Sequence, residues 1–425
     1  MASPPPSSPH PWRWIPTLYF AQGVPNAVAT SLAAVMFKNL GVSNADLALY
    51  LSWLYLPWVI KPLWSPLVDL HGTKRAWIVT LQFVTGVLLA TVALTVPAPD
   101  FVRYALVLLW LTAFSSATHD IAADGFYLLA LPAHQQAAFV GVRSTFFRVS
   151  TIAVKGGFVW LAGRLFGLTG SMTSAWVTIF VVLGGLFGLA ALYHLRFLPR
   201  PAADGPAKAA AEGAPGVLET FASFFAKPGI ALSIFFLLVY RLPEALALRL
   251  VEAFLLDPRS AGGLGLNNEQ VGLVNGTVGT VSLLLGGLLG GWLISRHGLK
   301  RLLWPMLIIM HVPIAVFVAL AAWQPASLVV ISAGLAVEQF GYGFGFTAYL
   351  VYMMFVARGS HQTAHYAICT GFMALGLMLP GMRAGVIQEH LGYAPFFGWA
   401  LVAVVPSLFA AALITIDAEF GRQRE

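Results

Sequence analysis

The sequence predicts an all-α membrane protein of twelve transmembrane helices, arranged as two pseudo-symmetric bundles of six. Three observations predict this class. Of the 425 residues, 58% are hydrophobic and only 10% are charged, with a mean hydropathy of +0.79, whereas about a quarter of the residues of a soluble domain are charged. Twelve apolar runs reach the roughly 20 residues that cross a bilayer. Two short motifs occur once in each half of the chain.

The apolar runs define the domain boundaries. They cover residues 15–37, 46–69, 76–96, 103–129, 138–162, 172–195, 230–255, 269–294, 302–322, 327–356, 364–388 and 394–416. The predicted parts are a disordered N-terminal tail (1–14), an N-terminal bundle (15–196), a cytoplasmic linker (197–229), a C-terminal bundle (230–417) and a C-terminal tail (418–425). The linker is rich in Ala, Pro and Gly and cannot bury a core of its own. A docking role for it is the alternative.

The basic residues decide the predicted orientation. An even number of spans places both termini on one side, and that side holds thirteen Lys and Arg against four in the opposite loops. Positive residues concentrate in cytoplasmic loops, so both termini are expected in the cytoplasm. This placement accounts for the net charge of +7 without a nucleic-acid partner. The single cysteine, Cys369, excludes an internal disulfide and a Cys-rich metal site.

Two motifs relate the halves. GVSNADLA at 41–48 echoes GLNNEQVG at 265–272, and SPLVDLHGTKR at 65–75 echoes GWLISRHGLKR at 291–301. Parallel halves with a binding site between them describe the major facilitator architecture. The loop after the second span looks like the major facilitator motif that latches cytoplasmic helix ends. The predicted gating residues are Asp69, Lys74, Arg75, Arg296 and Arg301.

Charged residues inside the spans indicate which helices line a cavity. An ionisable side chain remains in a bilayer where a pore, a relay or a partner offsets its cost. These residues lie on helices 2, 4, 5, 7, 10 and 11, while helices 3, 6, 9 and 12 carry none, although His311 interrupts helix 9. The intramembrane charges are Lys61, Asp120, Asp124, Arg143, Arg148, Lys155, Arg241, Glu244, Arg249, Glu252, Glu338 and Arg383.

Helix 4 contains SSATHDIAADGF, with Asp120 and Asp124 four residues apart on one face. Two carboxylates this close raise each other's cost of ionisation, and burial raises it further, so at least one is suited to bind and release a proton. Glu338 on helix 10 is the next candidate. His119 lies beside the pair but about 100° around the helix, so its role is open. The alternative is that an acid of helix 4 only pairs with an arginine of helix 5.

The remaining polar and aromatic side chains of these helices, with the neutral polar groups of helix 1, are candidates for substrate contact. Those of helix 5 form a cationic stripe that suits a carboxylate, a phosphate or sugar hydroxyls, and those of helix 10 include tyrosines on which rings can stack. Pairing between helices, or snorkelling in the case of Lys61, is the alternative. Gly341 and Gly345 of helix 10 have the GxxxG spacing that lets a neighbouring helix approach closely, so we expect them to serve packing. The predicted substrate-binding residues are Gln22, Asn26, Lys61, Trp64, Tyr127, Arg143, Arg148, Lys155, Arg241, Glu244, Tyr342, Tyr349 and Tyr352.

No enzyme motif occurs in the chain: HExxH, GxSxG and GxxxxGK[ST] are all absent. We therefore expect a transporter without a cofactor or metal, driven by the proton gradient. Its expected surroundings are membrane lipids and a small-molecule solute, and we expect a monomer.

Five stretches together resemble the AmpG-like muropeptide permeases, a branch of the peptide and acetyl-coenzyme A transporter family in the major facilitator superfamily. They are LYFAQGVPNAV, KPLWSPLVD, SSATHDIAADGF, YRLPEALALRLVEAFLL and VEQFGYGFGFTAYLVYMM. The resemblance implies proton-coupled uptake of a glycan-type solute across the bacterial inner membrane, and it matches Asp120, Asp124 and Glu338 to acids of the family. The family differs in a glutamine-type residue at the place of His119 and in additional C-terminal spans.

The expected function is a symporter that imports a muropeptide, amino sugar or oligosaccharide by alternating access. The excess of Lys and Arg in the spans keeps one alternative open, an exporter or carrier of an anionic, siderophore or drug-like solute. A second alternative is a membrane receptor or scaffold that moves no solute.

Overall fold

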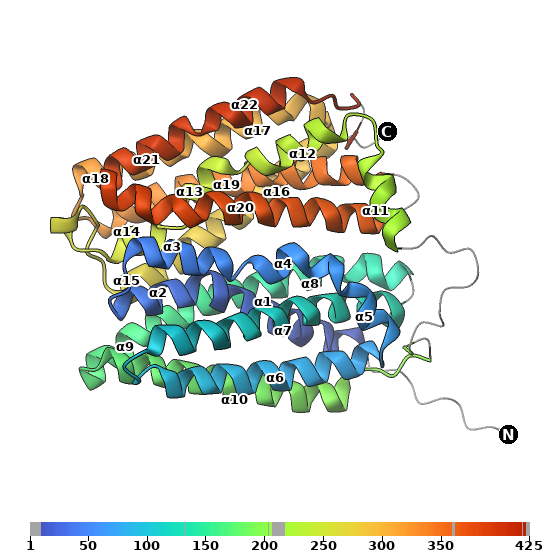
Figure 1. The fold of residues 1–425 in the computed structure, drawn as a ribbon, viewed down its shortest axis with the longest axis horizontal. Helices are drawn as coiled ribbons and strands as arrows, with labels where there is room; N and C mark the ends of the chain where they lie inside the picture. Colours follow the sequence, from blue (N-terminus) through green and yellow to red (C-terminus); the bar gives the residue numbers. More distant parts are fainter. Residues whose placement is uncertain are drawn as a thin grey trace. The chain divides into compact units, whose positions relative to one another are not determined.

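The computed structural model describes residues 10–131, 133–202, 204–205, 217–358, 362–418 and 420–421. All regular secondary structure of these residues is helical, as the sequence predicts (Figure 1). The predicted tails are described at residues 10–14, 418 and 420–421, and the predicted linker at residues 197–202, 204–205 and 217–229, where a helix covers 217–225. The roles of these segments stay predictions.

The helices of the first part of the chain are α1 (Ile15–Ala27), α2 (Ala33–Asn39), α3 (Asn44–Trp53), α4 (Leu56–Ile60), α5 (Ser65–Leu70), α6 (Lys74–Thr95), α7 (Phe101–Ala130), α8 (Ala133–Ile152), α9 (Val159–Thr169) and α10 (Met172–Phe197). Those of the second part are α11 (Val217–Phe225), α12 (Ile230–Val239), α13 (Leu242–Ala247), α14 (Val251–Leu256), α15 (Asn268–Val271), α16 (Thr280–His297), α17 (Leu299–His311), α18 (Ala315–Trp323), α19 (Leu328–Ala357), α20 (Gln362–Leu391), α21 (Tyr393–Val402) and α22 (Val404–Leu413).

Shorter helical segments join several of these helices. The π-helical segments are η2 (Val28–Leu32), η4 (Ala153–Phe158) and η6 (Gly272–Gly279), and the 3₁₀ segments are η1 (Pro11–Arg13), η3 (Lys61–Leu63), η5 (Arg259–Ala261) and η7 (Val312–Ile314).

Eleven helical stretches of the described chain are long and apolar enough to cross a membrane, and they correspond to eleven of the twelve predicted spans. The predicted span 46–69 is interrupted: α3, α4, η3 and α5 follow one another in its place. Proline lacks the backbone N–H that a helix interior needs. Pro57 and Pro62 lie where α4 begins and within η3, and they account for the interruptions there.

The described chain divides into two compact units, which we treat separately. Unit 1 holds described residues of 1–30, 63–154 and 165–213, and unit 2 holds those of 31–62, 155–164 and 214–425. Spans 1, 2 and 5 each contribute to both units. The predicted division into two bundles at the linker therefore stays a prediction.

In unit 1, α6 packs against α7 and α10, and α1 packs against α7 and α8. Gly23 lies where α1 packs against α8. A Cβ atom at this position would lie 2.0 Å from Ser150 Oγ and 2.8 Å from the Phe147 carbonyl oxygen. A residue without a side chain is therefore required there. The buried core at this end of the unit includes Trp14 and Phe126.

In unit 2, α19 packs against α16, α17 and α20, and α3 lies along α20. The predicted small-residue packing on helix 10 is confirmed. A Cβ atom at Gly341 would lie 2.3 Å from the Ile309 carbonyl oxygen, and one at Gly345 would lie 2.6 Å from that of Met306. These glycines let α17 approach α19.

The two copies of the first repeat, 41–48 and 265–272, begin helices in the same way, and both lie in unit 2. The side chain of Ser43 accepts a hydrogen bond from the Asp46 backbone N–H (3.1 Å), and that of Asn267 accepts one from Gln270 (2.9 Å). Each residue is the N-cap of its helix and satisfies a donor that the helix leaves free. The sequence repeat is therefore also a structural repeat.

Candidate functional site

Asp124 of α7 pairs with Arg143 of α8 in unit 1. The Arg143 Nη2 atom lies 2.9 Å from Asp124 Oδ1, and the Tyr19 hydroxyl donates to the same oxygen at 3.4 Å. The guanidinium also lies over the rings of Tyr19 and Tyr127, at 4.7 and 5.4 Å from their centroids. The pairing between helices 4 and 5 that the sequence left open is present. Tyr19 was not predicted, because only its position in space relates it to the acid.

Asp120 lies one turn before Asp124 and accepts a short hydrogen bond from Gln22 Nε2 on α1. The side-chain oxygen of Gln22, Oε1, is buried without a hydrogen-bond partner. Asn26, one turn further along α1, is half-buried. The two predicted acids therefore meet different neighbours, an amide for Asp120 and a guanidinium for Asp124.

His119 belongs to a separate chain of hydrogen bonds inside unit 1. Its Nε2 atom lies 3.0 Å from Gln82 Nε2, while Gln82 Oε1 lies 2.8 Å from His194 Nδ1. His194 Nε2 in turn lies 3.0 Å from the Thr17 hydroxyl. An amide that donates to one ring and accepts from the other is satisfied with both imidazoles neutral. His119 is therefore hydrogen-bonded to α6 and, through Gln82, linked to His194 of α10. This chain of hydrogen bonds does not include Gln22, Arg143 or Tyr19, which contact the two acids.

Trp64 and Arg148 are further predicted residues of unit 1. Trp64 donates from Nε1 to Thr118 at 3.1 Å and stacks near Phe114 of α7, with 5.4 Å between ring centroids. Arg148 is half-buried on α8. Lys61, in η3 of unit 2, is also half-buried.

In unit 2, Glu244 forms a sealed pair with His311. The carboxylate Oε1 lies 2.7 Å from His311 Nδ1, and each side chain is only 1% exposed. The second polar atom of each side chain, Glu244 Oε2 and His311 Nε2, has no hydrogen-bond partner. The sequence signal for this partner was the one histidine in an otherwise uncharged ninth span.

Lys155 interacts with Glu252, which was not a predicted site residue. Its Nζ atom lies 3.8 Å from Glu252 Oε1, and the same oxygen accepts hydrogen bonds from Ser31 (2.8 Å) and Asn275 (3.2 Å). Glu252 is 5% exposed. Its negative charge is thus held by one cation and two neutral donors.

The predicted aromatic face of α19 divides in two. Tyr349 and Tyr352 lie in the core of unit 2, where they donate to the Leu237 carbonyl (2.5 Å) and the Ser233 hydroxyl (3.0 Å). Tyr342 instead accepts a short hydrogen bond from Arg241. The helical period places all three on one side, but only the packing shows that two of them hold helices together.

Glu338 of α19 is fully buried. Its Oε2 atom accepts a hydrogen bond from Gln339 at 2.7 Å, and Oε1 has no hydrogen-bond partner. Within the described chain, the hydrogen bond to this carboxyl group comes from a neutral amide, which compensates a buried negative charge less well than a cation at the same distance.

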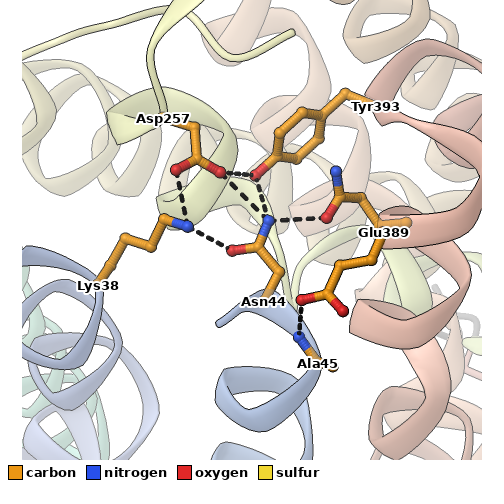
Figure 2. A network of polar contacts seen from close by, with 7 residues as sticks. Lys38, Asn44, Ala45, Asp257, Glu389 and Tyr393 are labelled. Carbon is orange, nitrogen blue, oxygen red and sulfur yellow. Dashed lines mark hydrogen bonds and ion pairs between the residues drawn. The ribbon is translucent and has the colours of Figure 1, made fainter. Parts of the chain in front are cut away.

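A polar network joins segment 31–62 to the second half of the chain within unit 2 (Figure 2). Lys38 lies 2.7 Å from Asp257, and the Tyr393 hydroxyl donates to the same carboxylate at 2.6 Å. Asn44 accepts from Lys38 at 2.7 Å and donates to Gln388 at 2.7 Å. We call these five residues the outer network, because the predicted topology places them at the outer ends of the spans.

The outer network was missed by the sequence analysis, although signals for it exist. Lys38 is one of the few basic residues predicted outside, and Asn44 lies in the first repeat. Its counterpart in the second repeat, Asn268, donates to Asn39 at 2.6 Å. Both repeats therefore use an asparagine to contact the end of α2.

The predicted gating residues of unit 1 bind the start of the linker. The Asp204 carboxylate accepts from the backbone N–H groups of Lys74 (2.7 Å) and Arg75 (3.0 Å), at the first turn of α6. In unit 2, Arg296 lies over the Trp292 ring at 4.2 Å and Arg301 is exposed. The Asp69 side chain lies outside the described part. The gating role stays a prediction.

The long apolar helices, with ionisable pairs buried among them, define a secondary transporter of the major facilitator fold. Two solved structures share this fold across nearly the whole chain. The nucleoside transporter NupG has a TM-score of 0.68 and 16% identity, covering 95% of this chain and 99% of that one. A D-xylose-proton symporter has a TM-score of 0.71 and 14% identity, covering 96% and 98%.

A model of the BT1 family matches residues 22–320, and the chain belongs to this family. The anhydromuropeptide permease of Escherichia coli (strain K12) is 26% identical over 412 residues, which are 95% of this chain and 80% of the relative. Putative transporter AmpG 4 of Rickettsia conorii is 20% identical over 405 residues, covering 92% and 93%. The expected likeness to AmpG-type permeases is confirmed, and the chain is a membrane transporter rather than an enzyme.

Proposed function

We propose that the protein is a proton-coupled symporter that imports a glycan-type solute, such as a muropeptide, amino sugar or oligosaccharide, by alternating access. We place it in the bacterial inner membrane with both termini in the cytoplasm. The observation that carries the proposal is the ion pair of Asp124 with Arg143, with Asp120 one turn away on the same helix.

The ion pair suits a switch because both partners are partly accessible. The side chains of Arg143 and Asp124 are 30% and 44% exposed, so a proton can reach the carboxylate. Protonation removes the negative charge that holds the guanidinium, and the second carboxylate one turn away favours that neutral form. Arg143 then becomes available to a solute, and release of the proton restores the pair. Binding of the solute and binding of the proton are linked through one arginine.

The relative from Escherichia coli supports the class of solute, since its name describes an anhydromuropeptide permease. Sugar rings stack on aromatic faces and exchange hydrogen bonds with amides and guanidinium groups. Unit 1 presents such groups around the acids. The residues we propose for solute contact there are Gln22, Asn26, Trp64, Tyr127, Arg143 and Arg148.

The outer network supports the alternating-access part of the proposal. The ion pair between Lys38 and Asp257 is 15% and 13% exposed, and two further side chains hold it. A contact of this kind closes one side while it is formed and must break when that side opens. We therefore propose the outer network as the outer gate.

Uptake by proteoliposomes tests the proposal. The purified protein is given a labelled anhydro-muropeptide or a labelled chitin oligosaccharide, with and without an inward proton gradient. We expect the gradient to accelerate uptake, and we expect Asp124→Asn to abolish that acceleration. Asp100→Asn, an exposed acid at the start of α7, is the matched control and should behave as wild type.

Three results of this assay would contradict the proposal. Wild-type flux that ignores the gradient excludes proton coupling. Gradient-driven extrusion in place of uptake supports the exporter instead. The absence of flux with every solute supports the receptor or scaffold.

A further inference from the structure

We infer that the transported solute carries an anionic group, and that Arg241 and Arg249 in the seventh span bind it. This inference rests on the proposed function, because it names a chemical property of the solute. Both arginines lie in unit 2.

The acids of this span and of the loop that follows it already have partners. Glu244 pairs with His311 at 2.7 Å, and Glu252 has Lys155 at 3.8 Å together with two neutral donors. Asp257 pairs with Lys38 at 2.7 Å. None of these carboxylates remains for an arginine of the same span.

The two arginines are buried without an acid. Arg241 is 5% exposed and Arg249 is 8% exposed. Among the described residues, no carboxylate lies within ion-pair distance of either guanidinium. Glu252 attracts the Arg249 guanidinium from beyond ion-pair distance. The positive charge of Arg241 repels that guanidinium. Two like charges buried together are costly unless an anion compensates them.

Both arginines lie where the helix is broken. Arg241 precedes α13, whose second residue is Pro243, and Arg249 lies in the turn between α13 and α14. Broken helices at membrane depth occur where the backbone is buried in protein or lines a solute path. In transporters they typically form the binding site.

The contacts of Arg249 leave its polar edge available. Its guanidinium lies 4.7 Å from the centroid of the Tyr55 ring, and no hydrogen bond to an acceptor in the described chain involves it. Ser52 is fully buried nearby, and its hydroxyl has no hydrogen-bond partner. A Cβ atom at Gly381 would lie 2.8 Å from Arg249 Nε and 2.9 Å from Ser52 Oγ. Glycine thus lets the backbone of α20 approach the Arg249 guanidinium and the unsatisfied Ser52 hydroxyl closely, without displacing either.

Arg241 has a matching environment. Its guanidinium lies 4.6 Å from the Phe346 ring centroid and donates to the Tyr342 hydroxyl. Its buried Nε–H has no acceptor. The planar fork of an arginine matches a carboxylate or phosphate through two parallel hydrogen bonds. Neighbouring aromatic rings suit the apolar faces of a sugar or peptide, so an acidic glycan is the class of solute that fits.

Equilibrium binding to the full-length protein in lipid nanodiscs tests the inference. The probes are three matched pairs: an anhydro-muropeptide and its carboxamide form, N-acetylneuraminic acid and its methyl ester, and glucose 6-phosphate and glucose. We expect at least one acid to bind tenfold or more tightly than its neutral partner. The pair that shows this preference tells a carboxylate from a phosphate.

Variants assign the preference to the two arginines. Arg241→Gln and Arg249→Gln should each bring the ratio of acid to neutral affinity close to one, while Arg249→Lys should retain part of it. Arg358→Gln is the matched control, since that arginine also lies over aromatic rings but is 52% exposed and 3.7 Å from Asp417. Gly381→Ala, which changes no charge, should weaken binding of the acid, because the added methyl group would displace the side chains of Arg249 and Ser52. It reports on the site if an arginine variant does not fold.

The inference is overturned if no acid binds, if each acid binds no more tightly than its neutral partner, or if the preference survives in both glutamine variants. The proposed function can fail or hold independently of this inference. Gradient-driven uptake of neutral solutes without any preference for acids would uphold symport and remove this inference. Arginine-dependent binding of an acid, together with uptake that does not respond to the proton gradient, would uphold this inference and contradict proton-coupled symport.

Discussion

The charged groups of the two units are arranged in opposite ways. In unit 1 an arginine and an acid form one partly exposed pair, with 30% and 44% exposure for Arg143 and Asp124. In unit 2 the acid Glu244 is sealed against His311 at 1% exposure, and two buried arginines have no carboxylate within ion-pair distance among the described residues. An accessible pair can exchange its proton and its partner, whereas a sealed pair mainly holds helices together. The pair of unit 1 therefore suits proton coupling. In unit 2, the pair of Glu244 with His311 suits a structural role, and the two arginines suit binding of the anionic group of the solute.

Breaking the sealed pair should have the largest effect. Glu244→Leu leaves His311 without its partner at full burial, and we expect a loss of about 3–5 kcal/mol in the free energy of unfolding. Thermal unfolding followed by tryptophan fluorescence measures it. The double variant Glu244→Leu, His311→Leu should recover most of the loss, because an apolar pair replaces the ionic one. A double variant as unstable as the single one would assign the pair another role.

Breaking the outer network should have an intermediate effect. Asp257→Asn removes the ion pair with Lys38, and we expect the outer side to open more often by about tenfold, the equivalent of about 1.4 kcal/mol. The readout is maleimide labelling of Val42→Cys in a Cys369→Ser background, since Val42 is 9% exposed. Asp100→Asn is the control. Unchanged labelling would mean that Asp257 does not hold the gate.

Breaking the accessible pair should change stability little and transport greatly. Arg143→Leu should cost about 1 kcal/mol or less, because the pair is partly exposed. Uptake in proteoliposomes should nevertheless lose its response to the proton gradient, because protonation of Asp124 can no longer release an arginine to the solute. A large loss of stability would make this pair a framework contact like that of unit 2.

The smallest effect is expected at Arg358. Its ion pair with Asp417 spans 3.7 Å between side chains that are 52% and 54% exposed. Such pairs contribute little, so Arg358→Gln should shift the free energy of unfolding by less than about 0.5 kcal/mol. A larger loss in the same thermal assay would show that burial does not explain the ranking of these pairs.

Sequence reasoning reached the fold because its signals are local. Length and hydropathy of each run predict a span, and eleven were confirmed as helical stretches long and apolar enough to cross a membrane. The run 46–69 is apolar enough for a span but contains three prolines, and the structure interrupts the helix there. Small residues at a spacing of four predicted the close helix contact at Gly341 and Gly345.

The candidate site was reached only in part. Asp120, Asp124 and Arg143 were predicted from their cost in a bilayer, and the structure brings Arg143 to Asp124. Helical period alone placed Tyr349 and Tyr352 with Tyr342, whereas packing buries the first two in the core. Period describes a face of a helix, but it does not say what covers that face.

What the sequence determined by itself is therefore the class of membrane transporter, the positions of the spans and the residues whose charge needs a partner, since each follows from composition and spacing along a few turns. Only the tertiary structure decided the partners. Glu244 and His311 are 67 residues apart, and Lys38 and Asp257 are 219 apart. A contact over such separations depends on how whole helices pack. Whether a charge is satisfied by the protein or left for a solute depends on that packing.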